Sequence, residues 1–234
     1  MKGYSTEMKK PVAGNQRNQK RLAICLALTA GYLDGYGLLV LGTFVSFMSG
    51  NTTMAGVRTG QANLLAALSP AIAIVFFVLG SLVGSVITSS RLRRAHRILF
   101  GIILVLLIFV RQLGSHGAAK NVSIALLGLG MGMVNPALSH IGAEAVSLTF
   151  MTGTLSRIGS HLALALRRAP LPASEGPWDS HLYRARIDAQ LWAAFVIGAA
   201  LSGLVTSFAT SFVLVPAIAI MLLLALIPVA SPSR

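Results

Sequence analysis

The chain has 234 residues, of which 55% are hydrophobic and only 11% are charged. A soluble domain carries about 25% charged residues, so this composition excludes an ordinary water-soluble globule. A net charge of +13 would indicate nucleic-acid binding in a soluble protein. Here long apolar runs identify a polytopic membrane protein instead, and no nucleic-acid partner is expected.

Residues 1–21 are basic and polar and include Pro and Gly, so we predict a disordered N-terminus. No small-residue cleavage site clearly ends the apolar run that follows, which favours an uncleaved span over a signal peptide. Cys25 is the single cysteine and lies within this run. One cysteine excludes an intrachain disulfide and a cysteine-based metal site, and we expect neither a metal nor a cofactor.

Six runs approach the length of about 20 apolar residues that a transmembrane helix needs. They cover residues 22–43, 68–88, 98–113, 122–141, 189–208 and 211–229. The third run is short, and the last two are nearly continuous, which predicts a tight helical hairpin. The expected fold is therefore all-α, a bundle of about six transmembrane helices that forms one domain over residues 22–229.

Lysine and arginine are unevenly distributed between these runs. Sixteen of the nineteen lie before the first run or after the second, fourth and sixth. Because cytoplasmic segments of membrane proteins are enriched in Lys and Arg, we assign these segments, and with them both termini, to the cytoplasm. The basic stretch "RLRRAHR" at 91–97 is interpreted as a topology anchor.

A short polar motif occurs twice. The cores of "FVSFMSGNTT" at 44–53 and "LTFMTGTLSR" at 148–157 align without a gap, residues 47–51 on residues 150–154, with an offset of 103. Further on, "FVLG" at 77–80 matches "FVIG" at 195–198. We infer two repeats, residues 22–113 and 122–229, each with three spans. Because three is odd, the repeats would be inverted, a pattern typical of transporters with a site at the repeat interface. The alternative is chance similarity between two glycine-rich stretches.

Each motif suits a broken or re-entrant helix. Gly50 and Gly153 supply conformational freedom, and the neighbouring side chains offer oxygens that can cap a starting helix. These candidate binding residues are Ser49, Asn51, Thr52, Thr152 and Thr154. The alternative is an ordinary helix end at each membrane surface.

Asp34 lies near the middle of the first span, in "GYLDGYG". A carboxylate in the bilayer is costly unless it faces protein or water, so Asp34 is predicted to bind a proton or cation. Tyr32 and Tyr36 flank it and can donate hydrogen bonds. The alternative is a hydrogen-bonded structural acid that ties helices together.

The fourth span holds Asn135 and His140 on either side of Pro136, which should kink the helix. Asn135 falls within two positions of the counterpart of Asp34. His140 is a candidate member of a proton relay, although a lone membrane histidine is more often structural. Glu144 is expected to pair with Arg157 or to lie at the interface.

Two small-residue faces, Gly80-x-x-x-Gly84 and Ala199-x-x-x-Gly203, lie at matching places in the two repeats. Such faces let helices approach closely, and we interpret them as packing surfaces within the monomer. A homodimer interface is the second interpretation, since the pattern is too common to decide between the two.

The segments "GYLDGYGLLVLGTFVSFMSGNTT" and "LGLGMGMVNPALSHIGAEAVSLTFMTGTLSRIG" closely resemble the YoaK-like family of small bacterial membrane proteins, defined as a domain of unknown function. The resemblance covers about residues 21–228 and implies a protein of the bacterial cytoplasmic membrane with about six helices. Asp34 and the segments 47–52 and 150–154 match the family pattern. "NPALSH" stands where the family more usually has a glutamine–asparagine pair.

These patterns favour a small secondary transporter or permease with a small-molecule or ion substrate. The alternative is a membrane scaffold or partner-binding subunit that does not transport. The sequence shows no metalloprotease, serine-hydrolase or phosphate-loop motif, so an enzyme is not expected. A polar cavity that reaches Asp34 from one side would distinguish a transporter from a scaffold.

Overall fold

The computed structural model describes residues 13–90, 94–113, 117–137, 140–141, 144–145, 151–171, 174 and 176–226. This part of the chain is a helix bundle, as expected. Its main helices are α1 (Ala13–Tyr36), α2 (Met48–Gly60), α3 (Leu64–Ser89), α4 (Ala95–Leu113), α5 (Gly117–Val134), α6 (Met151–Leu166), α7 (His181–Phe208) and α8 (Val215–Leu226). Short elements join them: a π-helix η1 (Gly37–Leu41), 3-10 turns η2 (Asn135–Ala137) and η3 (Thr210–Phe212), and the antiparallel strands β1 (His140–Ile141) and β2 (Glu144–Ala145).

Four described helical segments are long and apolar enough to cross a membrane. They are Arg17–Leu41, Leu64–Ser89, Ala95–Leu113 and His181–Phe208, whereas Val215–Leu226 is apolar but shorter. The two largest differences from the predicted starts are in α1 and α7. Helix α1 begins at Ala13, so residues 13–21 are helical, because no proline follows Pro11 there; residues 1–12 lie outside the described part. Helix α7 begins at His181, well before the predicted residue 189, because Ser180 caps it.

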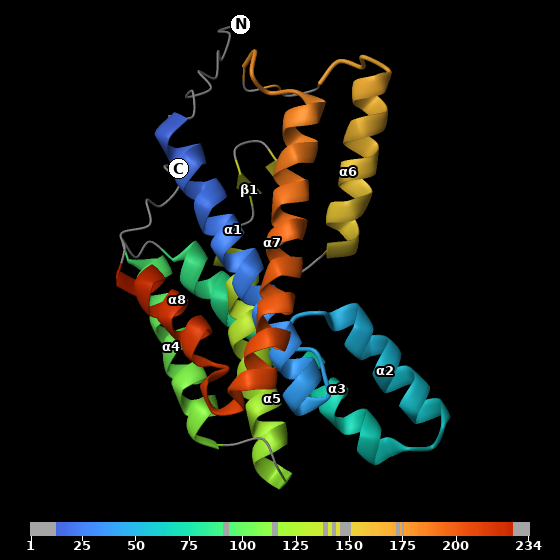
Figure 1. The fold of residues 1–234 in the computed structure, drawn as a ribbon, viewed down its shortest axis with the longest axis vertical. Coiled ribbons are helices and arrows are strands. Elements are labelled where there is room, and N and C mark those ends of the chain that lie inside the picture. Colours follow the sequence, from blue (N-terminus) through green and yellow to red (C-terminus); the bar gives the residue numbers. More distant parts are fainter. Residues whose placement is uncertain are drawn as a thin grey trace, which may run out of the picture.

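The long helices pack in pairs. Helix α1 lies along α7, α3 lies along α5, and α4 packs against both α5 and α8 (Figure 1). Two further helices extend from this core as arms: α2 packs on α3, and α6 packs on α7. Figure 1 places α2 at the lower right and α6 at the upper right, so the arms point to opposite ends of the bundle.

Glycine lets the backbones touch in both principal pairs. Where α1 meets α7, a Cβ atom at Gly31 would collide with the carbonyl of Phe195, and one at Gly198 with the carbonyl of Leu28. Where α5 meets α3, a Cβ atom at Gly132 would collide with the carbonyl of Phe77. One at Gly80 would likewise meet the carbonyl of Leu129. The four positions therefore need glycine for steric reasons.

The next turn of each crossing also carries a small residue. Gly35 of α1 faces Ser202 of α7, and Gly84 of α3 faces Pro136. The Gly80–Gly84 face is thus a packing surface within the monomer, as predicted. The corresponding face on α7, which packs on α1, consists of Gly198 and Ser202, one residue before the predicted Ala199 and Gly203. A Cβ atom at Gly203 would meet nothing within 4 Å.

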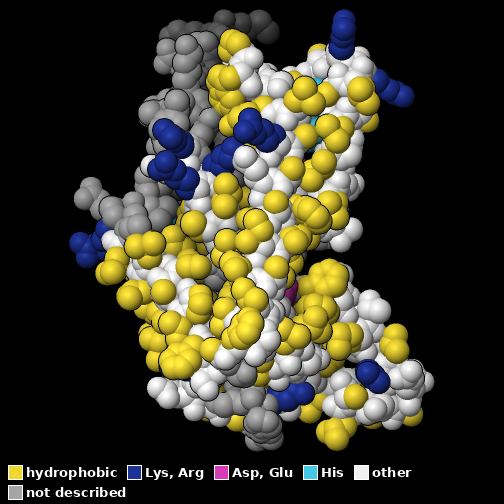
Figure 2. Space-filling view, viewed as in Figure 1, with side chains coloured by type: hydrophobic (Ala, Val, Ile, Leu, Met, Phe, Trp, Pro, Cys, Tyr) yellow, Lys and Arg dark blue, Asp and Glu magenta, His cyan; other side chains and the backbone are white. Residues whose placement is uncertain are grey.

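The core lies where α1, α4 and α5 converge, with Leu33, Phe100 and Met131 almost completely buried. The outer faces of α3 and α7 expose large apolar side chains instead, such as Val78 and Ile197. Hydrophobic side chains cover much of the middle of the visible face (Figure 2). An apolar exterior suits a helix bundle that is surrounded by lipid.

Candidate functional site

The first motif lies just after a break in helical structure. Helix α1 widens into the π-helix η1, which ends at Gly42 in the left-handed region, with φ of 63°. Gly42 is therefore the glycine of this segment that needs its conformational freedom. The chain then runs without regular helix until α2 begins at Met48. This break confirms that the motif does not continue the first helix.

Asp34 holds this break together. One carboxylate oxygen accepts hydrogen bonds from the backbone N–H of Val45 (2.8 Å) and of Ser46 (2.7 Å), and the other accepts from the Ser46 hydroxyl (2.6 Å). Asp34 is only 4% exposed. The carboxylate thus satisfies donors that would otherwise be orphaned beside the start of α2, where the helix dipole also favours negative charge.

Asn51, in the first turn of α2, secures the same segment from the other side. Its side-chain amide donates to the carbonyl of Phe44 (2.8 Å), and its side-chain oxygen accepts from the Phe44 N–H (3.2 Å). The oxygen also accepts from the Thr43 hydroxyl (3.3 Å). Asn51 is completely buried. The structure therefore brings Asp34 and Asn51 together around one loop, residues 42–47.

The other predicted residues of the first motif lie on α2. Gly50 is needed for space, because a Cβ atom there would collide with the Phe47 ring, which stacks edge-on against Phe44. Ser49 and Thr52 are exposed on α2, and the Thr52 hydroxyl donates to the carbonyl of Met48 within the same helix. Neither contributes to the hydrogen bonds around Asp34 described above.

The tyrosines beside Asp34 are both buried. The Tyr32 hydroxyl donates to the carbonyl of Val213 (2.6 Å), just before α8, so the expectation that it donates to Asp34 was wrong. Its position on the helix turns the ring toward α8 rather than toward the loop. Tyr36 is 5% exposed and packs within the core.

The second motif opens α6. Thr152 is exposed and Gly153 is partly buried, whereas Thr154 is completely buried. The Thr154 hydroxyl accepts from Arg157 (3.3 Å), and the Arg157 guanidinium also makes two bonds to Asp188 of α7, of 2.9 and 3.1 Å. Asp188 is fully buried and Arg157 is 28% exposed. This bidentate pair fixes α6 on α7.

Arg157 forms an ion pair with Asp188, whereas the sequence-based expectation for Glu144 was a pair with Arg157 or a place at the interface. The side chain of Glu144 lies outside the described part, as does that of His140, whose backbone belongs to strand β1. Asn135 is partly buried in the turn η2. Helix α5 ends at Val134, so Pro136 terminates the helix rather than kinking it.

Two further contacts join α6, α7 and the turn before α7. The Nδ1 atoms of His161 and His181 are 3.0 Å apart, a distance that requires one ring to donate to the other. Beyond them Arg184 forms a bidentate pair with Asp179, with bonds of 2.9 and 3.1 Å. Among the described residues, no group of three or more His, Cys, Asp and Glu side chains is arranged to hold a metal ion.

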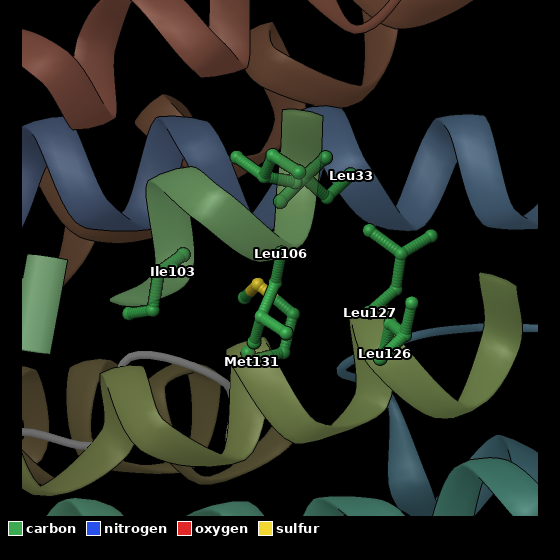
Figure 3. Close-up of a pocket in the computed structure, with 8 residues that line it drawn as sticks. Leu33, Ile103, Leu106, Leu126, Leu127 and Met131 are labelled. Atoms are coloured by element: carbon green, nitrogen blue, oxygen red, sulfur yellow. The ribbon is translucent and has the colours of Figure 1, made fainter. Parts of the chain in front are cut away.

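Next to Asp34 in the chain, Leu33 lines a small apolar cavity between α1, α4 and α5 (Figure 3). Leucine, isoleucine and methionine side chains make up most of its wall. Such a cavity offers no polar group to an ion or a polar solute. The cavity is therefore packing space in the core and not the polar path that a transporter would need.

The comparisons with known proteins agree with the family resemblance. Residues 22–227 match a family described as protein of unknown function, DUF1275. The chain belongs to this family. A relative, the UPF0700 transmembrane protein RA0705 of Rhizobium meliloti (strain 1021), is 30% identical over 179 residues, which cover 74% of this chain and 77% of the relative. No solved structure matches the chain. This DUF1275 protein is therefore a membrane protein from a family without an assigned function.

Sequence reasoning missed Ser46 and Asp188. Ser46 lies in the quoted motif, three residues before the predicted Ser49. Asp188 lies one residue before the predicted span 189–208, and the four-residue spacing of Arg184 and Asp188 fits a helix that begins earlier. Ser180, which accepts a hydrogen bond from the Tyr183 N–H (3.2 Å), was the available signal for the helix start.

Proposed function

We propose that this DUF1275 protein is a small secondary transporter, or permease, of the bacterial cytoplasmic membrane, built from two inverted repeats. The observation that carries the proposal is the pair of matched helix crossings. The contacts of Gly31 with Phe195 and of Leu28 with Gly198 correspond to those of Gly132 with Phe77 and of Leu129 with Gly80.

The correspondence holds residue by residue. Leu28 and Leu129 are 101 positions apart, as are Gly31 and Gly132, while Phe77 and Phe195 are 118 positions apart, as are Gly80 and Gly198. Helices α1–α4 would then form one repeat and α5–α8 the other. The opposite directions of the arms α2 and α6 in Figure 1 support inversion, since a parallel repeat would point both arms the same way.

The arms suit half-spanning helices. Helix α2 has 13 residues and α6 has 16, so each is on the order of 20–24 Å long, shorter than a hydrocarbon core of about 30 Å. Counting α1, α3, α4, α5 and α7, together with the predicted apolar run 211–229 that contains α8, gives the proposed six. Figure 2 shows a notch between the two arms, with an acidic side chain visible at its inner end. Breaks at matching places of inverted repeats are where transporters bind their substrates.

Asp34 is the group proposed to carry coupling. In the hydrogen bonds described above, its buried carboxylate accepts from two backbone N–H groups and one hydroxyl, which are all neutral donors. Adding a proton would remove the charge that these donors stabilise and loosen the loop 42–47 from α1. Movement of that loop with α2 would then open the notch. The structure corresponds to the closed state in this scheme, since Asp34 is 4% exposed.

The test is solute-driven proton movement in proteoliposomes that contain a pH-sensitive dye. Solutes of different classes (amines, carboxylates, sugars, inorganic ions) are added in turn to the wild type, Asp34→Asn and the exposed control Thr52→Ala. The proposal predicts that at least one class drives a pH change that Asp34→Asn abolishes and Thr52→Ala preserves. A pH change that persists in Asp34→Asn would contradict the role of Asp34.

A non-transporting scaffold is the second candidate, and one observation favours it. All three hydrogen bonds described for Asp34 serve local structure, and the described cavity beside it is apolar. The scaffold predicts that no solute class moves protons and that Asp34→Asn unfolds at a clearly lower temperature. Both candidates place the protein in the bilayer, and neither makes it an enzyme. A homodimer stays a prediction.

A further inference from the structure

A cluster of cations and aromatic rings lies where α1 and α7 begin. The Nζ atom of Lys20 lies 5.8 Å from the centre of the Tyr183 ring, a distance typical of a cation–π contact. Tyr183 in turn stacks edge-on against Trp178, with ring centres 5.3 Å apart. Arg186 is exposed on α7 one turn beyond Tyr183, and its charge acts on Lys20. We call these four residues the cationic–aromatic cluster.

The surroundings of the cluster leave it positively charged. The described acidic residues nearby, Asp179 and Asp188, are bound to Arg184 and Arg157. Further basic residues begin α1 and end α6, namely Arg17, Arg21, Arg167 and Arg168. Lys and Arg side chains gather over the upper part of the view in Figure 2. Two cations held close together at such an end favour an anion between them.

The cluster also lies at the start of two candidate membrane spans. The apolar segments Arg17–Leu41 and His181–Phe208 both begin beside it, so we expect the lipid headgroups at this level. Tyrosine and tryptophan are enriched at membrane interfaces, where they keep their polar atoms in contact with headgroups. Trp178 is 47% exposed and is therefore accessible to surrounding lipid.

We propose that the cationic–aromatic cluster is a binding site for the phosphate of an anionic phospholipid headgroup. Lys20 and Arg186 bind the phosphate, and Trp178 and Tyr183 pack beside the glycerol and the upper acyl chain. A basic side chain near an anionic membrane surface increases binding about fivefold, so two of them select an anionic lipid over a zwitterionic one. The site does not depend on whether the protein transports a solute.

The test uses the two tryptophans as separate reporters. With Trp192→Phe, Trp178 is the single tryptophan; with Trp178→Phe, the single tryptophan is Trp192, which is 38% exposed further along α7. Each protein is reconstituted into phosphatidylcholine vesicles with rising fractions of brominated phosphatidylglycerol or brominated phosphatidylcholine. Bromine quenches a tryptophan that it contacts. Quenching of Trp178 should favour phosphatidylglycerol about fivefold or more, and quenching of Trp192 should show little preference.

The variants Lys20→Gln and Arg186→Gln should each lower the preference at Trp178 about fivefold. Arg58→Gln, at the exposed end of α2, is the matched control and should leave it unchanged. The proposed site would be overturned if both tryptophans showed the same preference for phosphatidylglycerol. It would also be overturned if Arg58→Gln lowered the preference at Trp178 as much as Lys20→Gln and Arg186→Gln do. If added inorganic phosphate abolishes the preference, the cluster is a site for free phosphate, and the proposal of a lipid headgroup is wrong. If Lys20→Gln does not fold, exposed Arg186→Gln alone decides.

Discussion

The two arms of the molecule are secured by buried carboxylates in different ways. In the first half Asp34 holds the loop before α2 through backbone N–H groups and the Ser46 hydroxyl. In the second half Asp188 holds α6 through the guanidinium of Arg157. The second contact therefore joins two opposite charges, since a guanidinium keeps its charge at all ordinary pH values. The first contact joins a carboxylate to neutral donors, and the proposed function assigns the movable arm to α2.

The largest loss of stability is expected when the Asp34 carboxylate, the hydrogen-bond acceptor in the first half, is removed. Asp34→Ala leaves three donors without a partner, and because each orphaned buried donor costs about 1–3 kcal/mol, we expect a loss of about 4 kcal/mol in the free energy of unfolding. Asp34→Asn keeps an oxygen for the two N–H groups and should lose about 1 kcal/mol. Chemical unfolding in detergent measures both. Equal losses would show that charge, and not hydrogen bonding, secures the loop.

In the second half, removal of the Asp188 carboxylate should change stability in a different pattern. Asp188→Ala leaves Arg157 beside a buried interface without its carboxylate, and we expect a loss of about 3 kcal/mol, at the low end of the range for a broken buried pair because Arg157 is 28% exposed. Here Asp188→Asn should cost nearly as much, since Arg157 needs the charge. The double variant Arg157→Leu with Asp188→Leu should recover stability. If the double variant loses the sum of both single losses, the two residues are not coupled.

The helix crossings should show the smallest effects and no difference between the halves. Gly80→Ala and Gly198→Ala each force a Cβ atom against a carbonyl, at an expected cost of about 2 kcal/mol in both. Gly203→Ala is the control, because the open space there lets alanine gain its helix propensity of up to about 1 kcal/mol. Thermal unfolding compares the three. A large effect in one half alone would contradict the matched crossings.

The sequence predicted the membrane class and the break after the first helix, and it singled out Asp34 as a carboxylate that needs polar partners. A long apolar run or a buried charge can be accommodated in lipid in only a few ways, so these features can be predicted from the sequence. Partners distant in sequence were not predictable in this way. The Tyr32 hydroxyl reaches Val213, 181 positions away, because tertiary packing brings α8 there. The Asp188 pair was not predictable either, because Asp188 and Arg157 lie 31 positions apart and meet only through the packing of α6 on α7.

Cysteine labelling tests the proposed inversion of the two halves in the membrane. Single cysteines replace Gln61, at the end of α2, and Arg167, at the end of α6, in a Cys25→Ala background. Intact cells are treated with a reagent that cannot cross the membrane. The account predicts labelling at position 61 and protection at position 167 until the cells are opened. Labelling of both positions in intact cells, or of neither, would place the two arms on the same side and contradict the inverted arrangement.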